Sequence, residues 1–403
     1  MDSTDYRQEC LRLLSDTTYY APLTQDPTKS LLSQIKIMVE EAKGNAWVTF
    51  REAEFLVTTH LRTPYFYCLP KIHKGILPPP GRPIVSGTGS LLEPLSTFCD
   101  SFLQPLVKKS STYLKDTKDV LNLIEVINST TSVEALIILD FESLYTNIPQ
   151  AATLQVVEAA LLQHPWTSPT PVHFVMHCAS LAMTQNYFQF EETLYHQIRG
   201  TSMGSTFAPS LACLYMYQFE KLFILPTENP FFENIKLWRR YINDILIIWQ
   251  GSLQTIDSFT NWINTLDPFL RFTAHVSTTQ VPFLDLMIQI VNGKLVTDTY
   301  HKSTDRNSLL LYESHHPKAP RDNLPFGQFL RLRRNCSTAQ LFEAQACELE
   351  DKLRHRHYPT KIINPAYKRA RHNHREALLA PIMREEQVRL TCVSTYTPMS
   401  NTV

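Results

Sequence analysis

The sequence has little glycine and no paired cysteine motif. Only ten of its 403 residues are glycine, and six of these fall in two short windows, 75–89 and 200–204. Glycine is needed where the backbone turns sharply or approaches a ligand closely, so both windows are candidates for binding loops. None of the eight cysteines forms a C-x-x-C pair. This pattern argues against a zinc site and a disulfide framework, and is typical of a reducing compartment.

Long apolar runs and an excess of either charge are also missing. No run approaches the roughly 20 apolar residues that a membrane span needs, and the first residues lack the features of a signal peptide. We therefore expect an intracellular protein, nuclear or cytoplasmic, with no membrane partner. The net charge is zero, but residues 318–389 carry fifteen Lys and Arg against eight Asp and Glu. That excess fits either a phosphate-rich partner or an ordinary helical surface.

Residues 239–249 are predicted to form a β-hairpin that displays an acid. Two apolar, β-branched runs flank Asn243 and Asp244, and Asn and Asp tolerate the positive φ of tight two-residue turns. Such a turn lifts the Asp244 carboxylate out of an apolar sheet. The alternative, on this segment alone, is a plain turn aspartate.

A second acid, Asp140, follows the apolar run 133–139. A run of this length is typical of a central strand buried on both faces. An acid at the end of such a strand, facing Asp244 at a hairpin tip, can hold divalent metal. Two Mg²⁺ ions bridged by carboxylates stabilise the attacking and leaving oxygens in nucleotidyl transfer. Asp140 and Asp244 are therefore the candidate metal ligands.

Three further features could surround such a site. Lys71, Lys74 and Arg82 cluster on a Pro/Gly loop, which suits a triphosphate or is simply a solvated basic loop. Tyr145 could lie beneath a nucleotide sugar, or could be a core tyrosine. The glycine loop at 197–209 opens a helix and could hold phosphate or a base pair, although it is neither a Rossmann nor a Walker loop.

The rest of the chain is predicted to be mostly helical. A strong Asn-Gly turn at 292–293 predicts a second hairpin, and Asp285 on its first strand reads as structural. Ser337 is a candidate N-cap for one of the basic C-terminal helices, which suit a helix-turn-helix or a polymerase thumb. Helices are expected within 1–60 and 91–130, and over 151–163, 172–183, 253–266, 326–334, 337–354 and 359–371.

An ordered set of motifs between residues 65 and 367 resembles the reverse transcriptase of Penelope-like retroelements, which are relatives of telomerase. The motifs are YFYCLPKIHKG with RPIVSG, LDFESLYTNIP, QIRGTSMGSTFAPSLACLYMYQFE, RRYINDILIIW, VPFLDLMI and HKSTDRNSLLLYESHHP.

The resemblance implies an α+β right-hand polymerase. It implies a helical N-terminal extension over 1–60, fingers and palm over 61–300, and a basic helical thumb or helix-turn-helix region with a tail over 301–403. The activity implied is RNA-directed DNA synthesis with Mg²⁺ as cofactor. The partners implied are an RNA template, a DNA primer or RNA–DNA hybrid, and dNTPs.

The same resemblance assigns roles to single residues. Asp140 matches the first metal-binding acid. Lys71 and Arg82 match the cations that hold the incoming triphosphate, and Tyr145 matches the steric gate against ribonucleotides. The loop that checks the nascent base pair corresponds to Gln197 and to Gly200 through Gly204.

The chain departs from the family at two points. The family's hairpin reads Tyr-x-Asp-Asp, and Asn243 stands here at the first of its two acids. Loss of one negative charge should weaken metal binding, so we expect the chain to polymerise poorly or not at all. The GIY-YIG endonuclease that family members often carry has no counterpart in residues 393–403, so target cleavage is not expected.

Two other functions remain open at this point. A retained polymerase fold could bind RNA or RNA–DNA hybrid without catalysis. The C-terminal helices could instead make the chain a helix-turn-helix DNA-binding protein.

Overall fold

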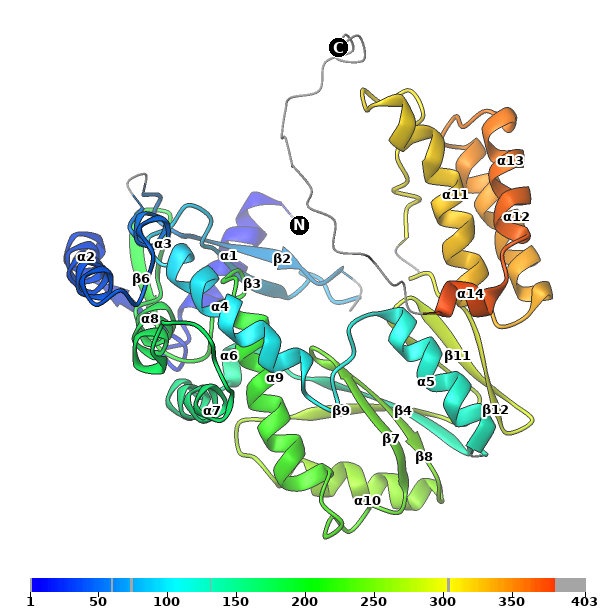
Figure 1. The fold of residues 1–403 in the computed structure, drawn as a ribbon, viewed down its shortest axis with the longest axis horizontal. Coiled ribbons are helices and arrows are strands. Elements are labelled where there is room, and N and C mark those ends of the chain that lie inside the picture. The colour runs from blue at the N-terminus through cyan, green and yellow to red at the C-terminus, as the bar shows by residue number, and fades with distance from the viewer. Residues whose placement is uncertain (1, 59–60, 73–74, 131, 303–304, 381–403) are drawn as a thin grey trace. The chain divides into compact units, whose positions relative to one another are not determined.

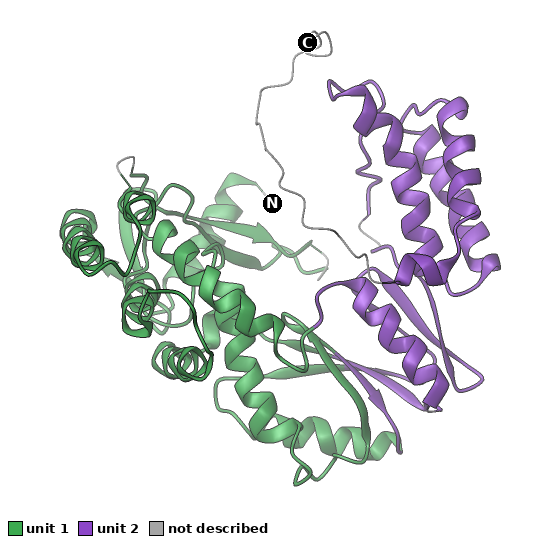
Figure 2. Ribbon diagram, in the orientation of Figure 1, with its two compact units in different colours: residues 1–113, 139–245, 252–274 green, residues 114–138, 246–251, 275–403 purple. Residues whose placement is uncertain are grey.

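The structure is a computed structural model that describes residues 2–58, 61–72, 75–130, 132–302 and 305–380. The chain divides into two compact units (Figure 2). Unit 1 comprises residues 1–113, 139–245 and 252–274, and unit 2 comprises residues 114–138, 246–251 and 275–403. Lys74 and the tail beyond residue 380, both considered in the sequence, lie outside the described residues.

A five-stranded sheet in unit 1 has the order β1-β6-β5-β2-β3. Its pairs are antiparallel except β2 with β5, which is parallel. Aromatic side chains bury one face, where Phe66 stacks on Phe188 at 5.5 Å between ring centroids and Tyr20 meets Phe188 edge-on at 5.7 Å. The strands are β1 (Tyr20–Leu23), β2 (Tyr65–Pro70), β3 (Gly81–Ser86), β5 (Tyr187–Phe190) and β6 (Thr193–Gln197).

Residues 2–58 are largely helical, as expected, but they also contribute a strand. Helices α1 (Ser3–Leu14), α2 (Thr28–Gly44) and α3 (Phe50–Leu56) accompany β1, which pairs with β6 in the register Tyr20 to Gln197. A capping box between Thr49 and Glu52 starts α3, satisfying two backbone donors at its N-terminus. The N-terminal segment is therefore an integral part of unit 1.

Helices α4, α7, α8 and α9 of unit 1 pack against one another (Figure 1). Helix α4 packs against α8 and α9. Pro209 lies in the first turn of α9, as the sequence predicted, where its missing N–H costs no hydrogen bond. The helices are α4 (Glu93–Lys108), α6 (Leu144–Asn147), α7 (Gln150–Gln163), α8 (Val172–Thr184), α9 (Ala208–Phe219), the π-helix Glu220–Ile224 and α10 (Leu253–Ile263).

A four-stranded sheet has the order β7-β8-β4-β9. Its strands are β7 (Ile235–Tyr241), β8 (Asp244–Trp249), β4 (Ala135–Phe141) and β9 (Phe272–Ser277). The inner strand β4 is buried along most of its length, and Asp140 is its one exposed residue. The predicted central strand and hairpin are therefore both present, and an acid emerges near the end of an apolar strand.

Unit 2 contains a three-stranded sheet and a helical bundle. Asn292 and Gly293 both adopt positive φ between β11 and β12, so the predicted Asn-Gly hairpin is confirmed. Helices α11, α12 and α13 pack around buried Phe329, Phe342 and Ile363. The elements are α5 (Thr117–Thr130), β10 (Gln280–Phe283), β11 (Leu286–Val291), β12 (Lys294–Thr299), α11 (Lys318–Asn335), α12 (Ala339–Arg354), α13 (Thr360–Arg371) and α14 (Arg375–Leu379).

The predicted N-cap at Ser337 is wrong by one residue. Thr338 caps α12 by accepting the N–H of Leu341. The Ser337 hydroxyl instead accepts the backbone N–H of Thr297 at 2.8 Å. Ser337 and Thr338 are both residue types that cap helices. Because the Ser337 hydroxyl is taken up by Thr297 of β12, Thr338 caps the helix.

The described part of the chain contains seven cysteines, and all of them are free thiols. Six are buried and Cys347 is exposed, and Cys392 lies outside the described residues. Within the same residues, no helix combines the length and apolar character needed to cross a bilayer.

Candidate functional site

A cavity of about 710 Å³ in unit 1 gathers residues from distant parts of the sequence. Lys71 follows β2 and Arg82 lies on β3, so the β2–β3 hairpin supplies two cations. Five of the predicted site residues line this cavity together: Lys71, Arg82, Asp140, Tyr145 and Asn243. Nucleotide-sized ligands need several hundred Å³, so the cavity is large enough for one.

The Asp140 side chain is exposed on an otherwise buried strand. Its neighbours Leu139 and Phe141 point into the core, and the alternation of a strand turns the carboxylate to the opposite face. The hydroxyl of Thr273 on β9 donates to the Asp140 carbonyl at 3.4 Å. Thr273 and Asp140 line the same cavity.

The hairpin turn lies one residue earlier than the sequence predicted. Its central residues are Ile242 and Asn243, and Asp244 is the first residue of β8. Ile242 adopts φ +54°, a left-handed conformation that a β-branched residue rarely accepts. Asn243 lines the cavity, whereas half-buried Asp244 is not among its lining residues.

Tyr145 lies on the short helix α6, and the glycine loop packs against its backbone. The N–H of Thr201 donates to the Tyr145 carbonyl at 2.7 Å. A Cβ on Gly200, where φ is +71°, would lie 2.4 Å from that carbonyl oxygen. Burial raises the pKa of the Tyr145 phenol to about 12, so its hydroxyl is neutral at physiological pH. Glycine is required at position 200 for this close approach, and contact of the loop with phosphate or a base pair stays a prediction.

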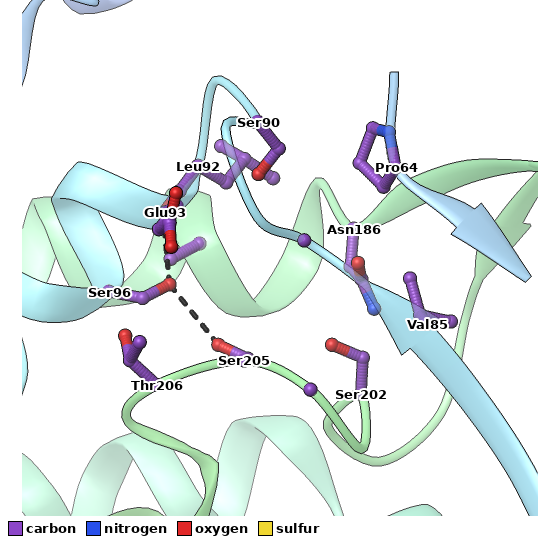
Figure 3. A pocket seen from close by; sticks show the side chains of 13 residues that line it. Pro64, Val85, Ser90, Leu92, Glu93, Ser96, Asn186, Ser202, Ser205 and Thr206 are labelled. Carbon is purple, nitrogen blue, oxygen red and sulfur yellow. Dashed lines mark hydrogen bonds between the residues drawn. The ribbon is translucent and has the colours of Figure 1, made fainter. Parts of the chain in front are cut away.

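The other end of the glycine loop is fixed to strand β3. The N–H of Val85 donates to the Met203 carbonyl at 3.1 Å, and a Cβ on Gly204 would lie 2.1 Å from the Val85 carbonyl oxygen. Figure 3 shows the small cavity beside this contact, where the Ser205 hydroxyl donates to the Ser96 hydroxyl at 3.2 Å. Its volume of about 30 Å³ holds about one water rather than a nucleotide.

Gln197 is buried, with 2% of its surface exposed. Its side-chain oxygen accepts from the Asn186 amide at 3.0 Å, and its own amide donates to the Arg199 carbonyl at 2.9 Å. It does not line the cavity that holds Asp140. These two hydrogen bonds fix the start of the glycine loop. A role for Gln197 in checking the nascent base pair stays a prediction.

Sequence reasoning missed a buried ion pair beside the hairpin. Glu220 and Arg240 are 0% and 1% exposed, and the Arg240 Nε donates to a Glu220 carboxylate oxygen at 2.7 Å. Glu220 lies in the largely apolar segment YMYQFEKLFI, whereas Arg240 lies in IKLWRRYIN, which contains three basic residues. The acid in an apolar segment was the available signal, because a buried charge is normally paired.

The donor set at the cavity fits a divalent cation only in part. Asp140, Glu142 and Asn243 line the cavity and offer two carboxylates and one amide oxygen, and Mg²⁺ takes such hard oxygen ligands. Asp244 follows Asn243 in the chain but is not one of the lining residues. Within the described ranges, no group of three His, Cys, Asp or Glu side chains could hold a metal.

The chain is similar to known proteins both in part of its sequence and in its structure. The family profile described as the animal helix-turn-helix domain matches residues 308–368. A search of curated proteins found no match.

Several solved polymerases are similar in structure at low sequence identity. Telomerase from Candida albicans, in complex with the TWJ fragment of telomeric RNA, matches with a TM-score of 0.55 at 11% identity, over 91% of this chain and 58% of that chain. Apo telomerase from Candida tropicalis, truncated from its C-terminal domain, matches with a TM-score of 0.43 at 13% identity, over 59% of this chain and 55% of that one. An RdRp complex gives 0.47 at 12% identity, over 84% and 30%.

The architecture is similar to that of the right-hand polymerases. This rests on the Candida albicans match together with the mixed α+β organisation of sheets and helices. The chain spans 58% of the length of that telomerase chain. The fold of this chain is therefore α+β and polymerase-like, as the sequence predicted.

Proposed function

We propose that this chain is an RNA-directed DNA polymerase of the Penelope-like reverse transcriptase family, weakened by Asn243. The observation that carries the proposal is the cavity of unit 1, which Lys71, Arg82, Asp140, Tyr145 and Asn243 line together. These residues come from four separate segments. The resemblance assigns four of them roles in nucleotidyl transfer, and Asn243 stands at the position of a metal-binding acid.

The substrate of the proposed reaction is a dNTP bound in this cavity. The Lys71 ammonium and the Arg82 guanidinium would neutralise the triphosphate, with Arg82 offering two parallel donors to its oxygens. The Tyr145 ring would lie under the sugar and disfavour a 2′-hydroxyl. Gly200 through Gly204 hold the Tyr145 backbone in place, since Thr201 donates to its carbonyl. Gln197 would support the nascent pair by fixing this loop.

Asp140 and Asp244 would hold Mg²⁺, with the Asn243 amide oxygen nearby. Bound Mg²⁺ stabilises the developing charge on the attacking and leaving oxygens of the transfer. The amide of Asn243 contributes an oxygen but no charge, so the protein attracts the cation less strongly than three carboxylates would. Weak polymerisation at ordinary Mg²⁺ follows from that loss.

The proposed macromolecular partners are an RNA template and a DNA primer. Support comes from the structural likeness to a telomerase solved with a fragment of telomeric RNA. In this proposal residues 61–300 supply fingers and palm, 301–403 supply the thumb, and 1–60 form an extension of the fingers. Phosphate contacts from the basic helices would hold the duplex without reading its sequence.

A second function is favoured by one observation of its own. The helix-turn-helix profile covers residues 308–368, a region that folds around its own buried core in unit 2. Binding of duplex DNA by these helices could accompany polymerase activity, or it could be the function of the chain in place of polymerase activity.

Primer extension on poly(rA)/oligo(dT) tests the proposal. The chain and its Asn243→Asp variant are compared with Mg²⁺ and with Mn²⁺, beside hybrid binding by each. We expect extension by Asn243→Asp and little or none by the original chain. Equal extension by both would show that Asp140 and Asp244 suffice and that the charge argument is wrong. Tight hybrid binding with no extension by either would favour a non-catalytic binding module.

A further inference from the structure

Two fully buried charges lie beside the hairpin that carries Asn243. The Glu220 carboxylate accepts four hydrogen bonds, two from Arg240, one from the Thr112 hydroxyl at 2.6 Å and one from the Trp238 indole at 3.0 Å. Glu220 begins the π-helix that follows α9, and π-helical turns are frequent at functional sites. Both carboxylate oxygens are therefore fully engaged.

The Arg240 guanidinium extends this network to the turn itself. Its Nη1 donates to the carbonyl of Ile242 at 3.2 Å, and its Nη2 donates to the Cys213 carbonyl at 3.1 Å. Ile242 is the turn residue with φ +54°. Burial lowers the pKa of Arg240, but Glu220 and Cys213 together raise it by more, and the net pKa lies above its usual range.

We propose that the Glu220–Arg240 pair is a positioning device that holds Ile242 of the Ile242–Asn243 turn in its left-handed conformation and thereby sets the position of the metal-binding side chains. The pair acts through the turn and touches no substrate. The role in positioning metal-binding side chains rests on the proposed function. The fixing of the turn by Arg240 does not depend on it.

The free-energy cost of burying the Glu220–Arg240 pair indicates that the pair does more than stabilise the fold. A buried ion pair can often be replaced by packed apolar residues with little loss, because desolvation offsets most of the attraction. Two apolar side chains would fill this space but would leave the Ile242 carbonyl without its charged donor. A left-handed β-branched residue persists only where its surroundings impose it, and Arg240 supplies that constraint.

Hydrogen exchange of the turn amides tests the inference without any need for polymerisation. Two variants are informative. In Arg240→Lys the charge remains, but one ammonium cannot reach Glu220, Cys213 and Ile242 together. In Glu220→Leu/Arg240→Met no buried charge is left unpaired. We expect the amides of residues 242–244 to exchange about tenfold faster in both variants, the factor for one charge-assisted hydrogen bond.

Tyr215→Phe is the matched control, because it removes one hydrogen bond of 2.9 Å to Asp267 elsewhere in unit 1 and should leave the turn unchanged. Two results would overturn the inference: unaltered exchange at 242–244 in folded Arg240→Lys, or turn amides that already exchange at the unprotected rate in the original chain. If the double variant does not fold, the exchange rates of residues 242–244 in Arg240→Lys alone test the inference.

A second readout connects the turn to the metal. In the Asn243→Asp background, Arg240→Lys should raise the Mg²⁺ concentration for half-maximal incorporation by about tenfold, as loss of an outer-shell contact does. A merely structural role would lower the fraction of folded enzyme without moving this midpoint, and that result would count against the inference. If Asn243→Asp incorporates no nucleotide, the proposed function fails, while the exchange experiment still stands.

Discussion

The residues around the cavity hold backbone conformations that most side chains resist. Ile242 and Ser143 have φ near +55°, and Ser143 also lines the cavity. Left-handed non-glycine residues cost free energy and gather at functional sites. The sequence predicted a turn at Asn243 and Asp244, because these types accept positive φ most readily. The strand β8 begins at Asp244, however, and that pairing moves the left-handed residue to Ile242.

At the same scale, Gly200 should be irreplaceable. Gly200→Ala places a Cβ 2.4 Å from the Tyr145 carbonyl oxygen at φ +71°, so backbone must move and the hydrogen bond from Thr201 must lengthen. We expect a loss of roughly 1–3 kcal/mol in the free energy of unfolding, measured by urea denaturation.

Gly327→Ala in α11 is the control for this substitution, since nothing lies within 4 Å of its added Cβ. It should stabilise the chain by roughly 0.5–1 kcal/mol through helix propensity. Similar effects of the two substitutions would contradict the close packing of the loop on Tyr145.

At the scale of elements, Asp285 connects three parts of unit 2. It lies between β10 and β11 and accepts from Thr117 of α5, from Arg331 of α11 at 2.8 Å and from Asn335 of α11 at 3.1 Å. The sequence reading of Asp285 as structural agrees with these contacts. Burial raises the pKa of Asp285, but the hydrogen bonds from Thr117 and Arg331 offset this, and the net pKa lies below its usual value.

This depressed pKa predicts how Asp285→Asn depends on pH. An acid whose pKa is lower in the folded state stabilises the fold above its unfolded pKa, about 3.9. That stability is lost as the pH falls through the lower folded value. We expect Asp285→Asn to cost roughly 1.5–3 kcal/mol at pH 7, with the difference shrinking below about pH 4.

Unfolding by urea across this pH range measures the effect. Glu350→Gln removes an exposed pair with Arg354 on α12 and should cost under about 0.5 kcal/mol at any pH. A constant penalty for Asp285→Asn from pH 7 to pH 3 would mean that its charge is not what joins α11 to the hairpin.

Local patterns predicted the helices and hairpins well, and distant pairings poorly. The apolar run of β4 and the Asn-Gly turn each specify an element by themselves. Strand β1 was missed because it has four residues, one of them Pro22, and pairs with β6 more than 170 residues later. The Glu220–Arg240 pair was missed because partner choice between buried charges depends on tertiary packing.

At the scale of the whole molecule, the two units carry separate candidate activities. The cavity belongs to unit 1, whereas the helix-turn-helix match belongs to unit 2. Helix α13 buries Ile363, Ala366 and Ala370 and exposes Lys361 and Lys368. An amphipathic helix with one basic face suits a phosphate backbone.

Neutralising that face should weaken nucleic-acid binding in a salt-dependent way. For Lys361→Gln/Lys368→Gln, the slope of log affinity against log salt should decrease in magnitude by about 2, near 0.9 for each lost phosphate contact. Fluorescence anisotropy with duplex DNA and with hybrid measures it. The pair Lys29→Gln/Lys36→Gln on α2, also exposed, should leave the slope unchanged, and an equal change in both would mean that α13 has no special role.

In the proposed function, the unit 1 cavity performs nucleotidyl transfer through Asp140. Single-nucleotide incorporation on a primed RNA template, with Asp140→Asn added to the Asn243→Asp variant, tests this role of Asp140. Loss of the metal ligand should reduce the rate by at least about a hundredfold while hybrid binding is retained. Undiminished incorporation without the Asp140 carboxylate would contradict the assignment of this cavity as the active site.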